Sequence, residues 1–207
     1  MTRLILIRHG QSEANRVSGF TGHSHIPLSE LGRRQAEKTA EYVEKNYKID
    51  EIYSSDLLRA YETGAALSKK LGMMEIKTDK GLREIYAGVW EGLPFAEIPE
   101  KYPEDFKKWK EHIEYCKCTG GESVAEMHER ILKTILRISK ENEGKTVAVT
   151  FHSTPIRAIA SYIKDGNINN MEETPWPSNA SVTVVDVENG KMTMPIYSYD
   201  EHLSDVQ

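Results

Sequence analysis

The sequence has few of the features that mark secreted or metal-stabilised proteins. It contains two cysteines, Cys116 and Cys118, two positions apart. Such close neighbours rarely form a stable structural disulfide, and no second cysteine pair is present to complete a zinc site. We therefore predict two free thiols in a reducing compartment.

Long hydrophobic runs and clusters of positive charge are also missing. The apolar run 4–7 is too short for a signal peptide, and no stretch approaches the length of a membrane span. The net charge is −5, and no clustered lysines and arginines indicate a surface for nucleic acid or membrane. We expect a cytoplasmic protein with neither of those partners. An anionic substrate would have to be bound by a local basic site.

What is present is typical of a folded globular chain. Hydrophobic residues make up 39% and charged residues 29% of 207 residues. This length can bury a sizeable core and predicts a single domain over residues 1–207.

The hydrophobic pattern alternates between strands and helices. Strands are expected at 4–7, 49–54, 74–78, 146–151, 181–187 and 192–199, with Asn189-Gly190 as a hairpin turn between the last two. Ser29, Asp56 and Ser123 are expected to cap helices, and a further helix is expected over 155–163. This order predicts an α/β fold: three-layer α/β/α with a mainly parallel central sheet.

The segment 81–121 interrupts this rhythm, and we predict a helical insertion over the active site. It is rich in proline, tryptophan, tyrosine and charge. Its aromatic residues either line a hydrophobic substrate pocket or form a small core of the insertion, and the core is favoured. They are Trp90, Phe95, Tyr102, Phe106, Trp109 and Tyr115.

Polar side chains follow three of the expected strands. Arg8 and His9 end the first strand, Arg59 follows the second, and His152 ends the strand 146–151. In open α/β sheets, ligands bind outside the carboxyl ends of the strands. We therefore expect these histidines and arginines to meet at one edge of the sheet.

Such a cluster suits phosphoryl transfer. A neutral imidazole can attack phosphorus and hold the phosphoryl group covalently. Guanidinium groups remain charged and bind two phosphoryl oxygens at once. A leaving alkoxide also needs a proton from a nearby acid, for which Glu13, Glu84 and Glu91 are the candidates.

Several segments together resemble the histidine phosphatase superfamily, the phosphoglycerate mutase-like group. A lone Arg-His-Gly is a weak signal, but the ten-residue match after a buried strand is specific, and the other segments follow in order. The matching segments are 6–15 (LIRHGQSEAN), 27–32 (PLSELG), 54–60 (SSDLLRA) with Glu62 and Thr63, 82–85 (LREI), 88–92 (GVWEG), 120–123 (GGES), 149–152 (VTFH), 179–181 (NAS) and 201–203 (EHL).

The resemblance implies a role for each matching residue. His9 corresponds to the phosphorylated nucleophile, and Glu84 to the proton donor of the phosphatase branch. Arg8, Arg59 and His152 correspond to the phosphate pocket. The resemblance implies no metal ion, and we expect no cofactor. Further contacts to phosphate or substrate are expected from Asn15, Thr21, Gly22 and Ser153.

The sequence around Glu84 favours hydrolysis over mutase chemistry. Glycolytic mutases of the family are usually longer and carry a Glu-Arg-His-Tyr-Gly type of segment there, whereas this chain has 84–92 (EIYAGVWEG). We predict a phosphomonoester hydrolase that acts on a small phosphorylated metabolite. The alternatives are a phosphoglycerate mutase and a phosphate-ligand binding protein with little turnover. The natural substrate remains open, as does the choice between monomer and homodimer.

Two positions depart from the family pattern. Ser153-Thr154-Pro155 follows His152 where two glycines are common, and Ser153 can still offer its backbone N–H and hydroxyl to phosphate. His25 stands where aspartate is frequent. His23 and His25 have no partners for a metal site nearby, so we interpret them as part of a solvated loop or pocket wall. His202, in the tail, is a weaker candidate for closing the site.

Overall fold

A six-stranded mixed sheet forms the centre of the fold in the computed structural model, which describes residues 1–206. The strand order is β3-β2-β4-β1-β5-β6, and β1, β2, β3 and β4 run parallel while β5 and β6 are antiparallel to their neighbours. The bounds of the strands are Thr2–Arg8 (β1), Glu51–Ser54 (β2), Ile76–Thr78 (β3), Thr146–Phe151 (β4), Val182–Glu188 (β5) and Lys191–Tyr199 (β6).

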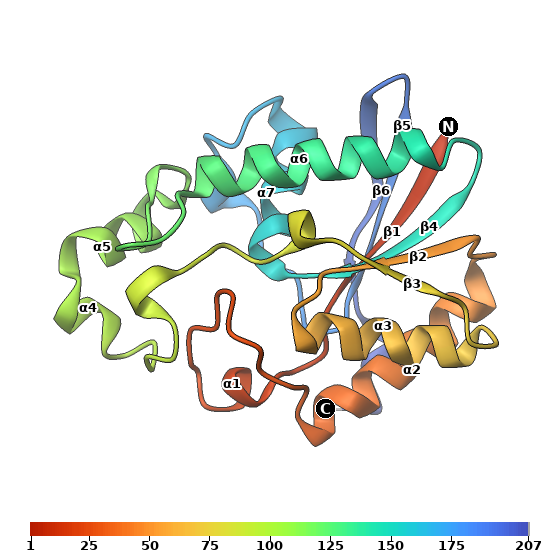
Figure 1. Cartoon of the computed structure of the whole chain (residues 1–207). Helices are drawn as coiled ribbons and strands as arrows, with labels where there is room; N and C mark the ends of the chain where they lie inside the picture. The colour runs from red at the N-terminus through yellow and green to blue at the C-terminus, as the bar shows by residue number, and fades with distance from the viewer. Residues whose placement is uncertain (207) are drawn as a thin grey trace.

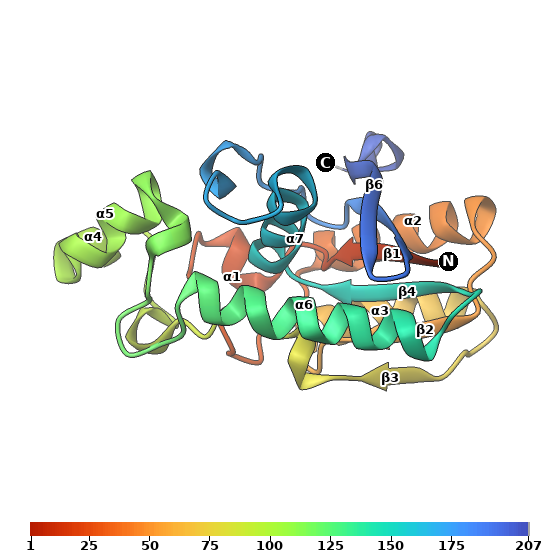
Figure 2. The same ribbon diagram turned by 90° about the horizontal axis from the view of Figure 1, so that it is seen from above.

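Helices cover both faces of this sheet. Helices α2 and α3 lie against one face and α6 and α7 against the other (Figures 1 and 2). The α/β/α architecture expected from the sequence is therefore confirmed. The bounds of the helices are Glu13–Arg16 (α1), Glu30–Asn46 (α2), Leu58–Lys70 (α3), Ile98–Lys101 (α4), Pro103–Glu111 (α5), Val124–Glu141 (α6) and Ser153–Asp165 (α7).

The side chains of strand β1 are buried on both faces of the sheet. Its side chains alternate, so that Leu4 and Leu6 join the core under α6 and α7, and Ile5 and Ile7 join the core under α2 and α3. All four are at most 1% exposed. A continuous apolar run is what a central parallel strand requires, because neither of its faces meets water.

The hairpin of β5 and β6 confirms the expected turn. Asn189 and Gly190 both have positive φ, 51° and 77°. Glycine adopts this region without steric cost and asparagine tolerates it, and the resulting turn matches the twist of the two strands.

Two of the three expected helix caps are present. The Ser29 hydroxyl accepts the backbone N–H of Gly32, and the Ser123 hydroxyl accepts that of Glu126. The prediction for Asp56 was wrong, because α3 has no side-chain cap. The Asp56 carboxylate instead pairs with the Arg83 guanidinium at 2.5 Å and joins the turn before α3 to the segment after β3.

The segment 81–121 lies beyond the end of the sheet toward which β1 and β4 run (Figure 1). Trp90 and Trp109 are buried and pack edge-on against Phe20, with ring centroids 5.6 and 5.2 Å apart. The core interpretation is thus confirmed for Trp90, whereas Trp109 both packs in this cluster and lines the cavity beside Glu84, as Phe95 does. Tyr115, by contrast, is 68% exposed.

Within residues 1–206, no helix is both long enough and apolar enough to cross a bilayer.

Candidate active site

The ends of β1 and β4 bring the two site histidines together. Arg8 pairs with Phe151 in the parallel register, so the residues that follow them, His9 and His152, lie at the same level. Their rings are 5.3 Å apart between centroids. Both histidines are almost completely buried, and the expected convergence at the sheet edge is confirmed.

Backbone contacts fix the ring and the tautomer of His9. Its Nδ1 lies 2.7 Å from the carbonyl oxygen of Gly10. A carbonyl can only accept, so Nδ1 carries the proton and Nε2 keeps its lone pair. The backbone carbonyl of His9 accepts from the backbone N–H of Ala180 and from Asn179 Nδ2, each at 3.1 Å.

Gly10 allows helix α2 to approach this turn closely. A Cβ atom at position 10 would lie 2.3 Å from the carbonyl oxygen of Gly32, in the first turn of α2. No side chain other than hydrogen fits there without displacing backbone. The Arg-His-Gly sequence is therefore also a packing requirement.

Arg59 links the nucleophile candidate to the loop 21–24. Its Nε donates toward His9 Nε2 at 3.2 Å, and its terminal nitrogens donate to the carbonyl oxygens of Ser24 at 3.0 Å and Gly22 at 2.9 Å. The side chain is fully buried in the first turns of α3. A guanidinium held at three points is fixed in position before any phosphoryl group arrives.

Glu91 holds the same loop from the other side. Its carboxylate accepts the backbone N–H of His23 at 2.7 Å and the hydroxyl of Ser24 at 2.8 Å. Gly22, with φ of +46°, leaves room for this carboxylate, because a Cβ there would lie 2.2 Å from Glu91 Oε1. Glu91 is therefore engaged in loop structure. Glu13, the other alternative acid, pairs with Arg16 on the surface at 3.0 Å.

Two buried polar atoms beside His9 lack a partner anywhere in residues 1–206: Arg8 Nε and His152 Nδ1. The other contacts of these side chains hold them in place. Arg8 donates to the carbonyl of Pro177 at 2.5 Å, and His152 Nε2 lies 2.9 Å from the Ser55 hydroxyl. Unsatisfied buried groups are costly unless a ligand completes them. Arg8 Nε and His152 Nδ1 are therefore suited to bind the oxygens of a phosphoryl group.

Burial keeps both histidines neutral. The pKa values of His9 and His152 lie well below the ordinary 6.5, first because of desolvation and then because Arg59 is close. Burial also lowers the pKa values of Arg8 and Arg59, to about 10, which leaves both charged at neutral pH. The site thus combines a neutral imidazole with two fixed positive charges.

Glu84 lies at the mouth of this cluster and is 7% exposed. Its Oε1 accepts the backbone N–H of Ile85 at 2.8 Å, and its Oε2 accepts that of Thr154 at 3.3 Å. The second contact comes from the first turn of α7, directly after His152. The Glu84 carboxylate is thereby oriented by its own segment after β3 and by the start of α7.

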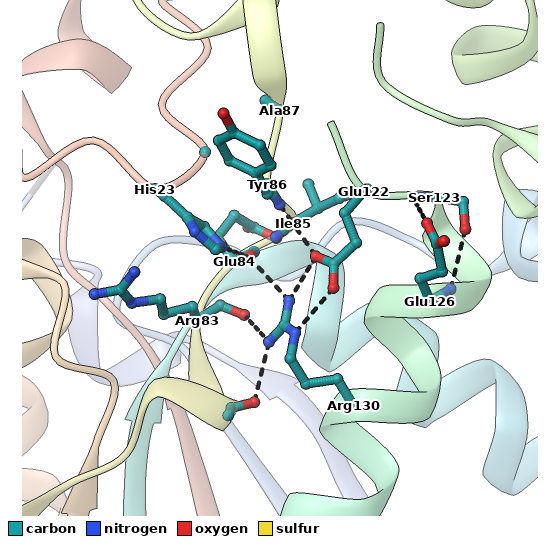
Figure 3. A network of polar contacts seen from close by, with 12 residues as sticks. His23, Arg83, Glu84, Ile85, Tyr86, Ala87, Glu122, Ser123, Glu126 and Arg130 are labelled. Atoms are coloured by element: carbon teal, nitrogen blue, oxygen red, sulfur yellow. Dashed lines mark hydrogen bonds and ion pairs between the residues drawn. The ribbon is translucent and has the colours of Figure 1, made fainter. Parts of the chain in front are cut away.

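Arg130 of α6 supports the backbone around Glu84 (Figure 3). It donates to the carbonyl oxygens of Gly81 at 3.0 Å, Arg83 at 2.9 Å and Glu84 at 3.2 Å, and it pairs with Glu122 at 2.7 Å. Sequence reasoning missed Arg130. The available signal was its position three residues after Met127, which places it beside the apolar stripe of the helix.

A cavity of about 200 Å³ opens beside Glu84. Its walls come from the loop after α1, the insertion, the start of α7 and the segment before β5. The lining residues are Gly19, Phe20, Thr21, Gly22, Glu84, Phe95, Trp109, Ser153, Thr154 and Trp176. Three of the four predicted substrate contacts, Thr21, Gly22 and Ser153, thus lie at this cavity.

The family model described as "Histidine phosphatase superfamily (branch 1)" matches residues 4–198. The chain belongs to this superfamily. It is a phosphoric monoester hydrolase whose reaction passes through a phosphohistidine.

Relatives of this histidine phosphatase span most of its length. It is 34% identical to phosphoserine phosphatase 1 of Hydrogenobacter thermophilus, over 91% of this chain and 88% of that protein. It is 38% identical to a glucosyl-3-phosphoglycerate phosphatase of Mycobacterium tuberculosis, over 87% of this chain and 83% of that protein. Among solved structures, YhfR of Bacillus stearothermophilus superposes with a TM-score of 0.92 at 27% identity, covering 98% of this chain and 100% of that one.

Asn15 lies at the edge of the site in this histidine phosphatase, in the cap of α1. The side-chain oxygen of Asn15 accepts from the backbone N–H of Ser12 in a helix cap and lies 3.3 Å from Asn179 Nδ2. Asn15 therefore reaches the His9 backbone through Asn179. Ser153 is the first residue of α7, which begins two residues earlier than predicted.

The other histidines lie outside the cluster. His23 Nε2 contacts the carbonyl of Glu84 at 2.8 Å, so it belongs to the wall behind that residue, and His25 is exposed. His202 stacks on Tyr42 with ring centroids 4.7 Å apart and lies 2.9 Å from the Thr39 hydroxyl of α2. It packs the C-terminal tail against α2, so the weaker expectation that it closes the site was wrong.

Proposed function

We propose that this histidine phosphatase hydrolyses small phosphomonoesters with His9 as the nucleophile and Glu84 as the acid and base. The observation that carries the assignment is the contact of 3.2 Å between Arg59 Nε and His9 Nε2. It places the lone pair of the neutral His9 imidazole next to the fixed guanidinium cation of Arg59 in a buried site. Phosphoryl transfer depends on such positioning and charge.

The first step forms a bond between His9 Nε2 and phosphorus. The bond between phosphorus and the leaving oxygen breaks, and that oxygen takes the proton of the Glu84 carboxylic acid. The phosphoryl oxygens bind Arg8, Arg59 and His152, two of which carry the unpartnered donor positions described above. The products of this step are phosphohistidine and an alcohol.

The second step reverses the role of Glu84. Its carboxylate takes a proton from water, the oxygen of that water attacks phosphorus, and the bond to His9 Nε2 breaks. Inorganic phosphate leaves, and Glu84 is again protonated for the next turnover.

We propose further that the leaving group is neutral and carries a ring. The cavity beside Glu84 has aromatic walls from Phe95, Trp109 and Trp176, and no lysine, arginine or histidine in the described chain lines it. A leaving group with a carboxylate would meet no basic side chain among the lining residues and would be bound there at a desolvation cost. Sugar rings and aryl groups pack well against aromatic faces.

The setting proposed for this activity is the cytoplasm, with a small phosphorylated substrate as the partner and neither nucleic acid nor membrane. Free, buried Cys116 and Cys118 support a reducing compartment.

The test is phosphate release from a panel of phosphomonoesters in excess EDTA. The panel contains p-nitrophenyl phosphate, a hexose phosphate, phosphoserine and 3-phosphoglycerate, and His9→Ala is the matched variant. We expect EDTA-resistant release by the wild type, none by His9→Ala, and higher kcat/KM for the two ring-bearing substrates. Faster release from phosphoserine would overturn the leaving-group class alone. Interconversion of 2- and 3-phosphoglycerate, or binding without release, would favour the mutase or the binding protein.

A further inference from the structure

A second cluster of ligand-type side chains lies away from His9. His112, Glu114 and Glu172 each offer one ligand atom, and these atoms all lie within 4.8 Å of one another. His112 Nδ1 is 3.9 Å from Glu114 Oε1 and 3.7 Å from Glu172 Oε2. His112 and Glu114 follow α5 in the insertion, whereas Glu172 comes from the short 3-10 helix after α7.

Glu114 is the unusual member, because its carboxylate is buried. Its side chain is 4% exposed, and Oε2 has no hydrogen-bond partner in the described part of the chain. An ionised carboxylate in such a place is destabilising unless a charge or a metal ion compensates it. The other two members are exposed, so the carboxylate can be reached from solvent through them.

Arg157 supplies only part of that compensation. Glu114 and Glu172 both act on it through space to raise its pKa, against the larger effect of burial. Its Nε and one terminal nitrogen donate to the backbone carbonyls of Thr174 at 2.5 Å and Glu172 at 2.8 Å. Its guanidinium stacks on the Trp176 ring, 4.3 Å from the centroid. No hydrogen bond from Arg157 to Glu114 is present within residues 1–206.

We propose that His112, Glu114 and Glu172 bind one divalent transition-metal ion, with Zn²⁺ as the probe. One imidazole and two carboxylates form a ligand set that Zn²⁺ uses, and the imidazole disfavours Mg²⁺. Ligand atoms of a tetrahedral zinc site are roughly 3.4 Å apart. The two distances from His112 to the carboxylates, 3.7 and 3.9 Å, are close to that separation, and all three ligand atoms lie within 4.8 Å of one another.

The ion would join two walls of the substrate cavity. His112 follows Trp109 on the same helix end, and Glu172 precedes Trp176 by four residues. The rings of Trp109 and Trp176 are stacked, with centroids 6.0 Å apart. An ion that links the two segments stabilises this stack without entering the chemistry at His9, so the inference is independent of the assigned catalytic roles.

The experiment is a titration of chelator-treated, full-length protein with ZnCl₂, followed by calorimetry and by thermal unfolding. We expect one high-affinity equivalent and a concentration-dependent rise in Tm for the wild type. His112→Ala and Glu172→Gln should each weaken Zn²⁺ binding at least tenfold. Both side chains are exposed, so the folded protein is retained. Glu173→Gln, its exposed neighbour, is the matched control and should bind as the wild type does.

Two further readouts separate this site from incidental binding. Mg²⁺ at the same concentrations should leave Tm unchanged, and Zn²⁺ should alter tryptophan fluorescence in the wild type but not in His112→Ala. Equal Zn²⁺ affinity in all four proteins, or no binding by the wild type, would overturn the proposal. Phosphate release by ion-free His112→Ala should stay within about twofold of the wild type, since the variant leaves the His9 cluster intact.

Discussion

Arg59 Nε and His9 Nε2 face each other at 3.2 Å, and this contact aligns the nucleophile candidate with its principal cation. The remaining guanidinium nitrogens are held by carbonyl oxygens of the loop 21–24. Arg59 therefore both holds the loop 21–24 in place and supplies positive charge beside His9, and substitution can separate these two roles.

Arg59→Lys should lower kcat by about 10²–10³-fold, the usual effect of removing one donor that stabilises transition-state charge. Lysine keeps the charge but cannot bind His9 and two carbonyl groups as a planar fork. The measurement is steady-state hydrolysis of p-nitrophenyl phosphate, with exposed Arg16→Lys as the control. A kcat within threefold of the wild type would show that charge alone suffices.

Glu84→Gln should affect substrates according to their leaving groups. An alkyl phosphate, whose leaving alkoxide needs a proton, should lose about 10²–10⁴-fold in kcat/KM, and a nitrophenyl phosphate much less. The measurement is a series of substrates with graded leaving-group pKa, and surface Glu13→Gln provides the comparison. Equal losses along the series would remove Glu84 from the role of acid.

Arg130→Met should lower kcat with little change in KM, because Arg130 holds the backbone of Glu84 and is not itself one of the residues that line the cavity. Small displacements of a catalytic group are costly, so we expect a loss on the order of tenfold, largest for alkyl phosphates. Arg130→Lys should recover part of it.

The control for this positioning role is Arg137→Met, two turns further along α6, where the side chain pairs with Glu141 at 3.0 Å and with Asp79 but donates to no backbone carbonyl around Glu84. It should leave kcat unchanged. If Arg130→Met altered Tm alone, or changed all substrates equally, its contribution would be to stability and not to the orientation of Glu84.

Stability should decline with acid because of His9 and His152. Their pKa values in the folded protein lie well below 6.5, whereas the unfolded chain binds their protons near that value. The unfolded state therefore binds more protons below about pH 6.5, and the free energy of unfolding falls there by up to about 1.4 kcal/mol per pH unit for each group. Above about pH 6.5 the two histidines no longer make the free energy of unfolding depend on pH.

Urea unfolding between pH 7.5 and 5 measures this slope. In His152→Asn the number of protons taken up on unfolding, which this slope measures, should decrease by about one, because one of the two buried imidazoles is gone. An unchanged slope would mean that His152 is protonated in the folded state or that other groups dominate.

The sequence by itself determined the local parts of this protein. Strand β1 could be read from its apolar run, and the Asn189-Gly190 turn from residues that tolerate positive φ. Ser29 and Ser123 could be read as caps, because a cap depends on residues within one helical turn. The residues Arg8, His9, Arg59 and His152 lie at or just beyond strand ends, and parallel strands bring such ends to one edge.

Only the tertiary structure decided contacts between distant segments. Asp56 was expected to cap α3, but Arg83 offered its carboxylate a charged partner from another part of the chain. Glu91 was a candidate acid until the folded loop gave it three backbone and hydroxyl donors. Arg130 and the pairing of Trp109 with Trp176 likewise join elements far apart in sequence. A side chain's partners there depend on how helices and loops pack, and no local pattern carries that information.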